Sequence, residues 1–423
     1  MFNKIVIKNG AIYIGFEVLN KALPFILVPV LTHYISPTGF GLIANFNAIY
    51  GVLTVLVGLS IHGAVNIAYV KYGKKEISTY VFNSLIILTI SLIIIFFGSL
   101  LFSKTFWLIS SLPIIWLYIG IFSAAMQFVT SINLVLWQAE KRAINYGAYQ
   151  LLQTLFNFCL TMYLVIIVSM DWEGRLYAQN FIVVIFAILS LYILIKRKYL
   201  SAEFNSVYVV DALKYGVPLI PHALSTWIFF GFNILLITIV LGESEAGIYS
   251  VSMQFAMIMS IINHAANRAI QPFFFEKLVN ISKSQKALLV KYIYLGFISI
   301  LIIGLLLILA TNMVVNISVE EQFQEAKKYL PILIISAVFN GMYLLVVKFI
   351  FFINKTYYVT LATFCSAIAH VVLSTLLIYS IGVLGVAIAT LASSIIGFFI
   401  TWYISSRVFP MPWFNLKYLV KSA

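Results

Sequence analysis

The chain has 423 residues, of which 63% are hydrophobic and only 9% are charged. A soluble domain has roughly 45–50% apolar and 25% charged residues, so the composition excludes a soluble globular protein and predicts an integral membrane protein. The formal charge of +13 is better explained by membrane topology and anionic lipid than by nucleic acid, because Lys and Arg accumulate in the cytoplasmic loops of membrane proteins.

Hydrophobic segments predict an all-α fold. A hydrocarbon core about 30 Å thick needs roughly 20 apolar residues per helix. The first span is expected to be retained rather than cleaved, because it is long and holds two charges. We predict twelve transmembrane helices, near residues 10–35, 40–66, 80–102, 112–137, 148–170, 176–195, 213–240, 247–272, 288–311, 329–352, 357–379 and 385–406.

Basic residues predict the orientation of these spans. Of the 26 Lys and Arg, 19 lie at the termini or in the even-numbered connections, and only four lie in the odd-numbered ones. Because Lys and Arg favour short cytoplasmic loops, both termini are expected on the cytoplasmic side of a multi-pass protein.

The first span, from Ile12 to Leu31, carries a carboxylate and an ammonium one turn apart, Glu17 and Lys21. An ionised side chain at the bilayer centre costs roughly 2.5–3.5 kcal/mol, so such groups usually face protein or water. Their spacing favours an i,i+4 ion pair. In one interpretation the pair only neutralises itself. In the other, Lys21 binds an anionic substrate while Glu17 exchanges a proton or cation and couples transport to a gradient. The sequence leaves both open.

Prolines predict bends in the first and seventh spans. The first span contains Pro24 and Pro29, and the seventh contains Pro218 and Pro221. Proline removes a hydrogen bond to the carbonyl four residues earlier, so backbone oxygen should be exposed near Asn20 and Lys214.

Internal similarity indicates two parallel six-span halves. When the halves are aligned, Gly41 falls on Gly247, and Gly174 falls on Gly385. Many transporters place their substrate between two such related halves. We predict an N-terminal bundle over 1–198, a cytoplasmic linker over 199–211, a C-terminal bundle over 212–406 and a cytoplasmic tail over 407–423.

The eighth and tenth spans contain the other intramembrane cations. Arg268 lies in "INHAANRAIQPFF" with Asn263 and Asn267 nearby, and Lys348 lies in "LVVKFIFFINK". Arginine offers a forked donor for phosphate and lysine a mobile point charge, while the amides suit sugar hydroxyls. We therefore predict that the substrate-binding residues are Lys21, Asn263, Asn267, Arg268 and Lys348. The alternative for Arg268 and Lys348 is that they snorkel to the membrane interface.

Neither cysteines nor histidines suggest a metal or redox centre. Cys159 and Cys365 fall within apolar runs and are expected to be small core side chains rather than a disulfide. The histidines are scattered over different spans without metal-ligand spacing. We expect no catalytic residue, no metal and no cofactor other than an ion or proton gradient.

Four Gly-centred segments resemble a known family. They are "ISPTGFG", "GESEAGIYS", "DWEGRLYAQ" and "IGVLGVAIATLAS", and together with the twelve spans they resemble the Wzx-type O-antigen and polysaccharide-unit flippases of the multidrug/oligosaccharidyl-lipid/polysaccharide exporter superfamily. The resemblance implies two bundles around a central cavity. It implies transfer of an undecaprenyl-pyrophosphate-linked oligosaccharide from the cytoplasmic to the periplasmic leaflet of the bacterial inner membrane by alternating access.

The same resemblance implies cationic residues on the first and eighth spans, where Lys21 and Arg268 fall. It also gives membrane lipid, a polysaccharide polymerase and a chain-length regulator as candidate partners, and no nucleic acid.

Two other function classes compete with this one. A drug or metabolite exporter of the same superfamily would usually favour an acidic cavity, whereas the intramembrane charges here are three basic to one acidic. A membrane polysaccharide polymerase would need a large outward loop or clustered carboxylates and histidines. The sequence therefore favours a transporter of an anionic lipid-linked glycan over an enzyme.

Overall fold

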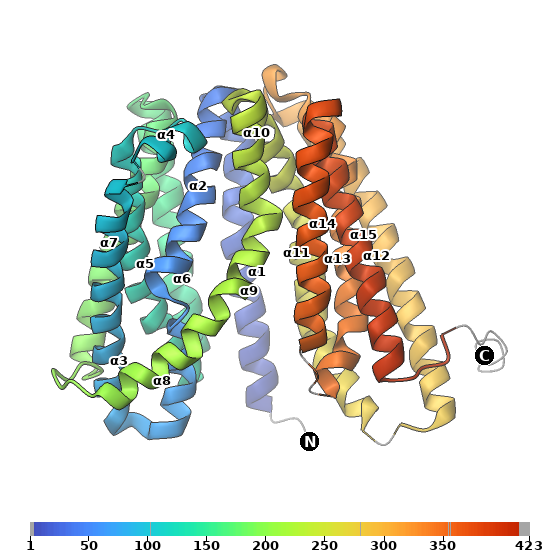
Figure 1. Cartoon of the computed structure of the whole chain (residues 1–423), viewed down its shortest axis with the longest axis horizontal. Coiled ribbons are helices and arrows are strands. Elements are labelled where there is room, and N and C mark those ends of the chain that lie inside the picture. Colours follow the sequence, from blue (N-terminus) through green and yellow to red (C-terminus); the bar gives the residue numbers. More distant parts are fainter. Residues whose placement is uncertain (1–3, 102, 280, 354, 356, 414–423) are drawn as a thin grey trace. The chain divides into compact units, whose positions relative to one another are not determined.

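The computed structural model describes residues 4–101, 103–279, 281–353, 355 and 357–413. All regular structure among these residues is helical (Figure 1). The predicted twelve spans are confirmed: the segments long and apolar enough to cross a membrane are Gly15–Thr32, Pro37–Gly73, Glu76–Leu101, Ile114–Ala139, Ala143–Ile167, Asp171–Lys196, Ser206–Leu241, Glu243–Gln271, Ser284–Ser318, Ala326–Phe352, Tyr357–Ile381 and Val383–Val408.

Internal contacts divide the chain into two compact units, residues 1–247 and 248–423. The helices of unit 1 are α1 (Lys4–Thr32), α2 (Pro37–Gly58), α3 (His62–Leu101), α4 (Ser103–Ser110), α5 (Ile114–Ala139), α6 (Ala143–Met162), α7 (Asp171–Lys196), α8 (Ser206–Gly216), α9 (Ile220–Trp227), α10 (Asn233–Leu241) and the start of α11 (Glu243–Leu278). Unit 2 holds the rest of α11 and then α12 (Lys283–Ser318), α13 (Ala326–Phe352), α14 (Tyr357–Ile381) and α15 (Val383–Val408).

The seventh span, formed by α8, α9 and α10, belongs to unit 1 by its contacts. The units therefore do not divide at the linker predicted over 199–211. The Trp227 indole donates to the carbonyl of Ala48 in α2 (2.7 Å), and Thr238 donates to Asn45 of the same helix (2.7 Å). The division into six-span halves, which rests on the repeat rather than on contacts, stays a prediction.

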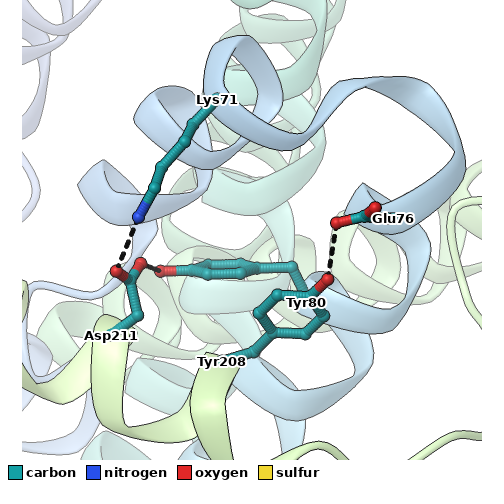
Figure 2. A network of polar contacts seen from close by, with 5 residues as sticks. All are labelled: Lys71, Glu76, Tyr80, Tyr208 and Asp211. Carbon is teal, nitrogen blue, oxygen red and sulfur yellow. Dashed lines mark hydrogen bonds and ion pairs between the residues drawn. The ribbon is translucent and has the colours of Figure 1, made fainter.

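A polar cluster fastens α8 to α3 (Figure 2). Asp211 of α8 accepts from the Lys71 ammonium and from the Tyr80 hydroxyl, both at 3.1 Å. Tyr208 donates to Glu76 at 2.7 Å, and its ring packs 5.6 Å from that of Tyr80. These contacts give the start of the seventh span a second attachment within unit 1.

The repeat glycines Gly41 and Gly247 occupy the same close helix crossing within unit 1. A Cβ on Gly41 would lie 1.9 Å from the Glu243 carbonyl oxygen, and one on Gly247 would lie 1.9 Å from that of Pro37. Because neither glycine has a side chain, the backbones at the starts of α2 and α11 lie in direct contact. This contact explains why glycine occurs at both aligned positions: any side chain at either one would separate α2 from α11.

Of the two spans in which the sequence predicted bends, only the seventh is interrupted among the described residues. After α8 the chain forms a 3₁₀ turn over Val217–Leu219, which contains Pro218, and a π-helical turn over Ile228–Phe232 precedes α10. In α1, Pro24 and Pro29 lie inside a continuous helix. Gly73, with φ of 73°, breaks α3 between the second and third spans.

Cys159 and Cys365 are free, but both are exposed, so their predicted burial is wrong. Cys159 lies on the face of α6 that also exposes Leu152 and Phe156, and this apolar face suits lipid. Hydrophobicity alone does not distinguish a core position from a lipid-facing one, because both are apolar in a membrane protein.

The start of the predicted cytoplasmic tail packs against unit 2. Trp413 is buried, and its carbonyl accepts from the Tyr294 hydroxyl of α12 at 2.6 Å. Lys286 donates to the Pro410 carbonyl at 3.1 Å. Residues 414–423 of the predicted tail lie outside the described residues.

Candidate functional site

The predicted ion pair of the first span is present. The Lys21 ammonium lies 2.9 Å from a carboxylate oxygen of Glu17, one turn earlier on α1. Both side chains are partly exposed, at 41% for Lys21 and 28% for Glu17. The geometry is compatible with a self-neutralised pair and with a cation that an anionic ligand can reach.

Asn20 adds an unsatisfied polar group beside this pair. Its amide nitrogen and oxygen are both buried and find no hydrogen-bond partner among the described residues. Pro24 lies four residues later in the same helix, and it lacks the N–H that would otherwise bond the Asn20 carbonyl. This part of α1 therefore combines charge with unused hydrogen-bonding capacity.

In unit 2, three predicted residues lie along the packing of α11 on α13. Asn263 is 6% exposed and donates its amide to the carbonyl of Ala337 at 2.8 Å. The Asn263 side chain occupies the space beside Gly341, where a Cβ would lie 2.5 Å from its oxygen. One turn on, the Asn267 side-chain oxygen is buried without a partner among the described residues. Asn263 is thus engaged in helix packing, and its contact with sugar stays a prediction.

Lys348 is the most deeply buried of the predicted cations. Its side chain is 2% exposed, and its ammonium finds no hydrogen-bond partner among the described residues. The ammonium lies 5.1 Å from the ring centre of Phe274 on α11, within cation–π range. The interpretation of Lys348 as a snorkelling side chain is therefore wrong: the ammonium is enclosed by α11 and α13 rather than extended to the interface.

Arg268 lies on the same helix but has an exposed side chain. It follows Asn267 directly, and neighbouring residues on a helix point about 100° apart. Arg268 therefore does not share the buried contact of α11 with α13. Unit 2 presents one accessible cation and one enclosed cation on neighbouring helices.

Arg175 is a functional candidate that the sequence interpretation missed. The sixth span was predicted to begin at residue 176, which left Arg175 in the preceding connection, but Arg175 lies inside α7. Its guanidinium donates from one nitrogen to Asn157 (2.6 Å) and Thr161 (3.1 Å) of α6. Both partners are neutral. The signal was the i,i+4 spacing of Asn157 and Thr161 in the fifth span, which places two polar groups on one helical face.

Unit 1 also has an open groove of about 690 Å³ between α5, α6 and α7. Its lining is mostly apolar, with Phe122, Leu160 and Phe181 among the side chains, and it includes none of the predicted site residues. Hydrocarbon suits such a surface, so the groove adds nothing to the charged candidates.

Comparison with known proteins assigns the family. The polysaccharide biosynthesis protein family matches residues 6–278. The chain belongs to this family. The resemblance drawn from the sequence is thereby confirmed at the level of the family.

Two relatives from Haemophilus influenzae extend the match over most of the chain. Protein 1 of the Lsg locus is 26% identical over 378 residues, covering 86% of this chain and 90% of the relative. An uncharacterized membrane protein of the same organism is 28% identical over 373 residues, covering 87% and 88%.

Solved structures support the fold assignment. A multidrug resistance MATE family transporter of the MOP superfamily aligns with a TM-score of 0.74 at 14% identity, covering 92% of this chain and 95% of that one. A MATE structure in complex with MaL6 gives a TM-score of 0.65 at 15% identity, covering 96% of each chain. The MATE-like neighbours have two six-helix bundles, in agreement with the predicted fold class.

The enclosed ammonium of Lys348 leads to a stability prediction for this family member. Replacing Lys348 by Met keeps an unbranched chain of similar length but removes the cost of desolvating a charge, so the protein should become more stable, by about 1–4 kcal/mol. Thermal unfolding in detergent measures the change. Lys328→Met is the matched control and should change little, because the Lys328 side chain is 62% exposed and its ion pair is with the exposed Glu325. A lower unfolding temperature for Lys348→Met would show instead that the ammonium stabilises the packing of α11 on α13.

Proposed function

We propose that the protein is a flippase that moves an undecaprenyl-pyrophosphate-linked oligosaccharide, such as an O-antigen or related repeat unit, from the cytoplasmic to the periplasmic leaflet of the bacterial inner membrane. It works by alternating access, with both termini cytoplasmic. The observation that carries the proposal is the set of cations that lie within the spans of a polysaccharide biosynthesis family member. Lys21 and Arg268 are accessible, and Lys348 has no carboxylate partner among the described residues.

The chemistry of the cargo explains why such cations are needed. A pyrophosphate with about two negative charges cannot cross hydrocarbon unaided, because transfer of an isolated ion to a low-dielectric medium costs tens of kcal/mol. The polyprenyl chain can remain in lipid, so the protein has to accommodate only the phosphates and the sugars. Arg268 offers a forked donor to phosphate, and Lys21 offers a mobile point charge. The unsatisfied amide oxygen of Asn267 suits a sugar hydroxyl.

Within this proposal Glu17 is the coupling residue. It holds Lys21 in the empty state, and it becomes protonated when phosphate takes the lysine. A pair that only neutralised itself would be less costly as two apolar residues, because burying two charges is rarely repaid in full by their attraction.

A multidrug or metabolite exporter is the second candidate function. It is supported by the likeness to the multidrug resistance MATE family transporter, which at 14% identity concerns the fold. The excess of basic over acidic groups in the spans favours an anionic cargo and disfavours cationic drugs.

Replacement of Arg268 tests the proposal. Arg268→Ala should lower translocation of the lipid-linked unit by at least about tenfold, the size of one lost charge-assisted hydrogen bond. Arg268→Lys should restore it only in part, because the fork is lost. Surface polysaccharide, normalised to the amount of protein in the membrane, is the measurement. Full display by the Ala variant at native expression would contradict a binding role for Arg268.

The Glu17–Lys21 pair needs a test of its own. Glu17→Gln combined with Lys21→Gln removes both charges while keeping side chains of similar length, so a purely self-neutralising pair would be replaced without loss of function. If Lys21 binds phosphate and Glu17 couples transport, the double variant should insert and fold normally but stay inactive. Translocation near the wild-type rate, at equal protein levels, would leave the pair as a structural ion pair only.

A further inference from the structure

Arg175 is an intramembrane cation whose hydrogen-bonding capacity is only partly used. One guanidinium nitrogen donates to Asn157 and Thr161. The other N–H donors of the guanidinium have no partner among the described residues. The side chain is partly buried, and the remaining guanidinium nitrogens are not among the fully enclosed, unpartnered polar atoms of the described residues.

The direct hydrogen-bond partners of Arg175 are neutral. Asn157 and Thr161 are uncharged, and although Asp171 lies one turn earlier on α7, no carboxylate of the described residues forms an ion pair with the guanidinium. Membrane arginines are normally paired or extended to the interface, because a bare charge in a span is costly. The two neutral partners fix the orientation of the guanidinium and leave its charge for another group.

A polar strip on α6 leads to this position. Gln150, Gln153, Asn157 and Thr161 follow one another at intervals of three or four residues, so they share one helical face. The exposed apolar face of α6, with Leu152 and Phe156, points elsewhere. Polar side chains in spans usually face protein or water rather than lipid. Gln150, Gln153 and Asn157 are partly buried and Thr161 is fully buried, so the strip faces away from lipid and ends at Arg175.

Helix contacts place Arg175 at a different depth from Lys21. α6 packs on α1 so closely that a Cβ on Gly147 would lie 2.1 Å from the Phe16 ring. Helix α1 forms the first span and α6 forms the fifth, so both cross the membrane in the same direction. At 1.5 Å per residue, Asn157 then lies about 8 Å and Thr161 about 14 Å beyond the level of Lys21.

The start of α7 gives an independent estimate. A Cβ on Gly39, in the first turn of α2, would lie 3.2 Å from Trp172, so the start of α2 is level with the start of α7. The short turn between α1 and α2 places the end of α1 near the same level. Counted from that level, Arg175 is about 6 Å deep and Lys21 about 16 Å deep. The two estimates agree on a step of about 10 Å.

We propose that Arg175, oriented by Asn157 and Thr161, is a second phosphate-binding site of unit 1, one step of about 10 Å beyond Lys21 along the polar strip of α6. Its ligand is the pyrophosphate of a lipid-linked saccharide, so the inference rests on the proposed function.

Binding of polyprenyl pyrophosphate tests this assignment. Wild-type protein and an Arg175→Gln variant are placed in phosphatidylcholine nanodiscs and titrated with undecaprenyl pyrophosphate. Gln keeps a donor for Asn157 and Thr161 but removes the charge, so affinity should fall about tenfold, as expected for one charge-assisted hydrogen bond. The unfolding temperature should stay close to that of the wild type. Lys328→Gln, an exposed cation, is the control and should bind normally.

Three results would overturn the inference in different ways. Equal affinity of Arg175→Gln and wild type would make Arg175 a hydrogen-bonded link between α6 and α7 only. If Arg175→Gln instead lost binding of phosphatidylglycerol, added in place of the pyrophosphate lipid, the site would serve a membrane headgroup. If the wild type itself failed to bind undecaprenyl pyrophosphate, the proposed function would fail, and the inference with it. The first two outcomes leave the proposed function intact.

Discussion

The cost of an ionised group in hydrocarbon is the constraint on which the rest of this structure depends. Twelve apolar spans leave few places for charge, and each cation that remains within them must be stabilised by the protein or by a ligand. The protein handles its intramembrane cations differently. Lys21 is paired with Glu17, Lys348 is enclosed over Phe274, and Arg175 is held by two neutral side chains. Only the first has a carboxylate partner among the described residues.

This distribution fits a protein that handles anions. A carboxylate beside each cation would be the simplest way to lower the free energy of the resting state, but it would also compete with phosphate for the same donors. Neutral partners fix a cation in place without that competition. The stability lost to unneutralised charge is the expected cost of a binding site that has to release its ligand.

The sequence predicted the number of spans and the Glu17–Lys21 pair, because hydropathy and i,i+4 spacing are local properties of the chain. It failed where the outcome depends on helix packing. Lys348 lies close enough to a loop to snorkel, yet the packing of α11 on α13 encloses it. Arg175 fell outside the sixth span predicted over 176–195, because the first residues of α7 are polar and do not resemble an apolar span. The attachment of the seventh span to unit 1 depends on contacts such as that of Lys71 with Asp211, residues 140 positions apart, which hydropathy cannot indicate.

Transport selectivity in proteoliposomes tests the central claim most directly. Purified protein in phosphatidylcholine vesicles is given a fluorescent polyprenyl-pyrophosphate-linked saccharide, the same saccharide on an uncharged polyprenol, or a cationic dye, and movement between leaflets or into the lumen is followed by quenching. If the intramembrane cations bind an anionic cargo, only the pyrophosphate-linked lipid should move at a rate that depends on the protein. Movement of the cationic dye without movement of the pyrophosphate-linked lipid would contradict the account.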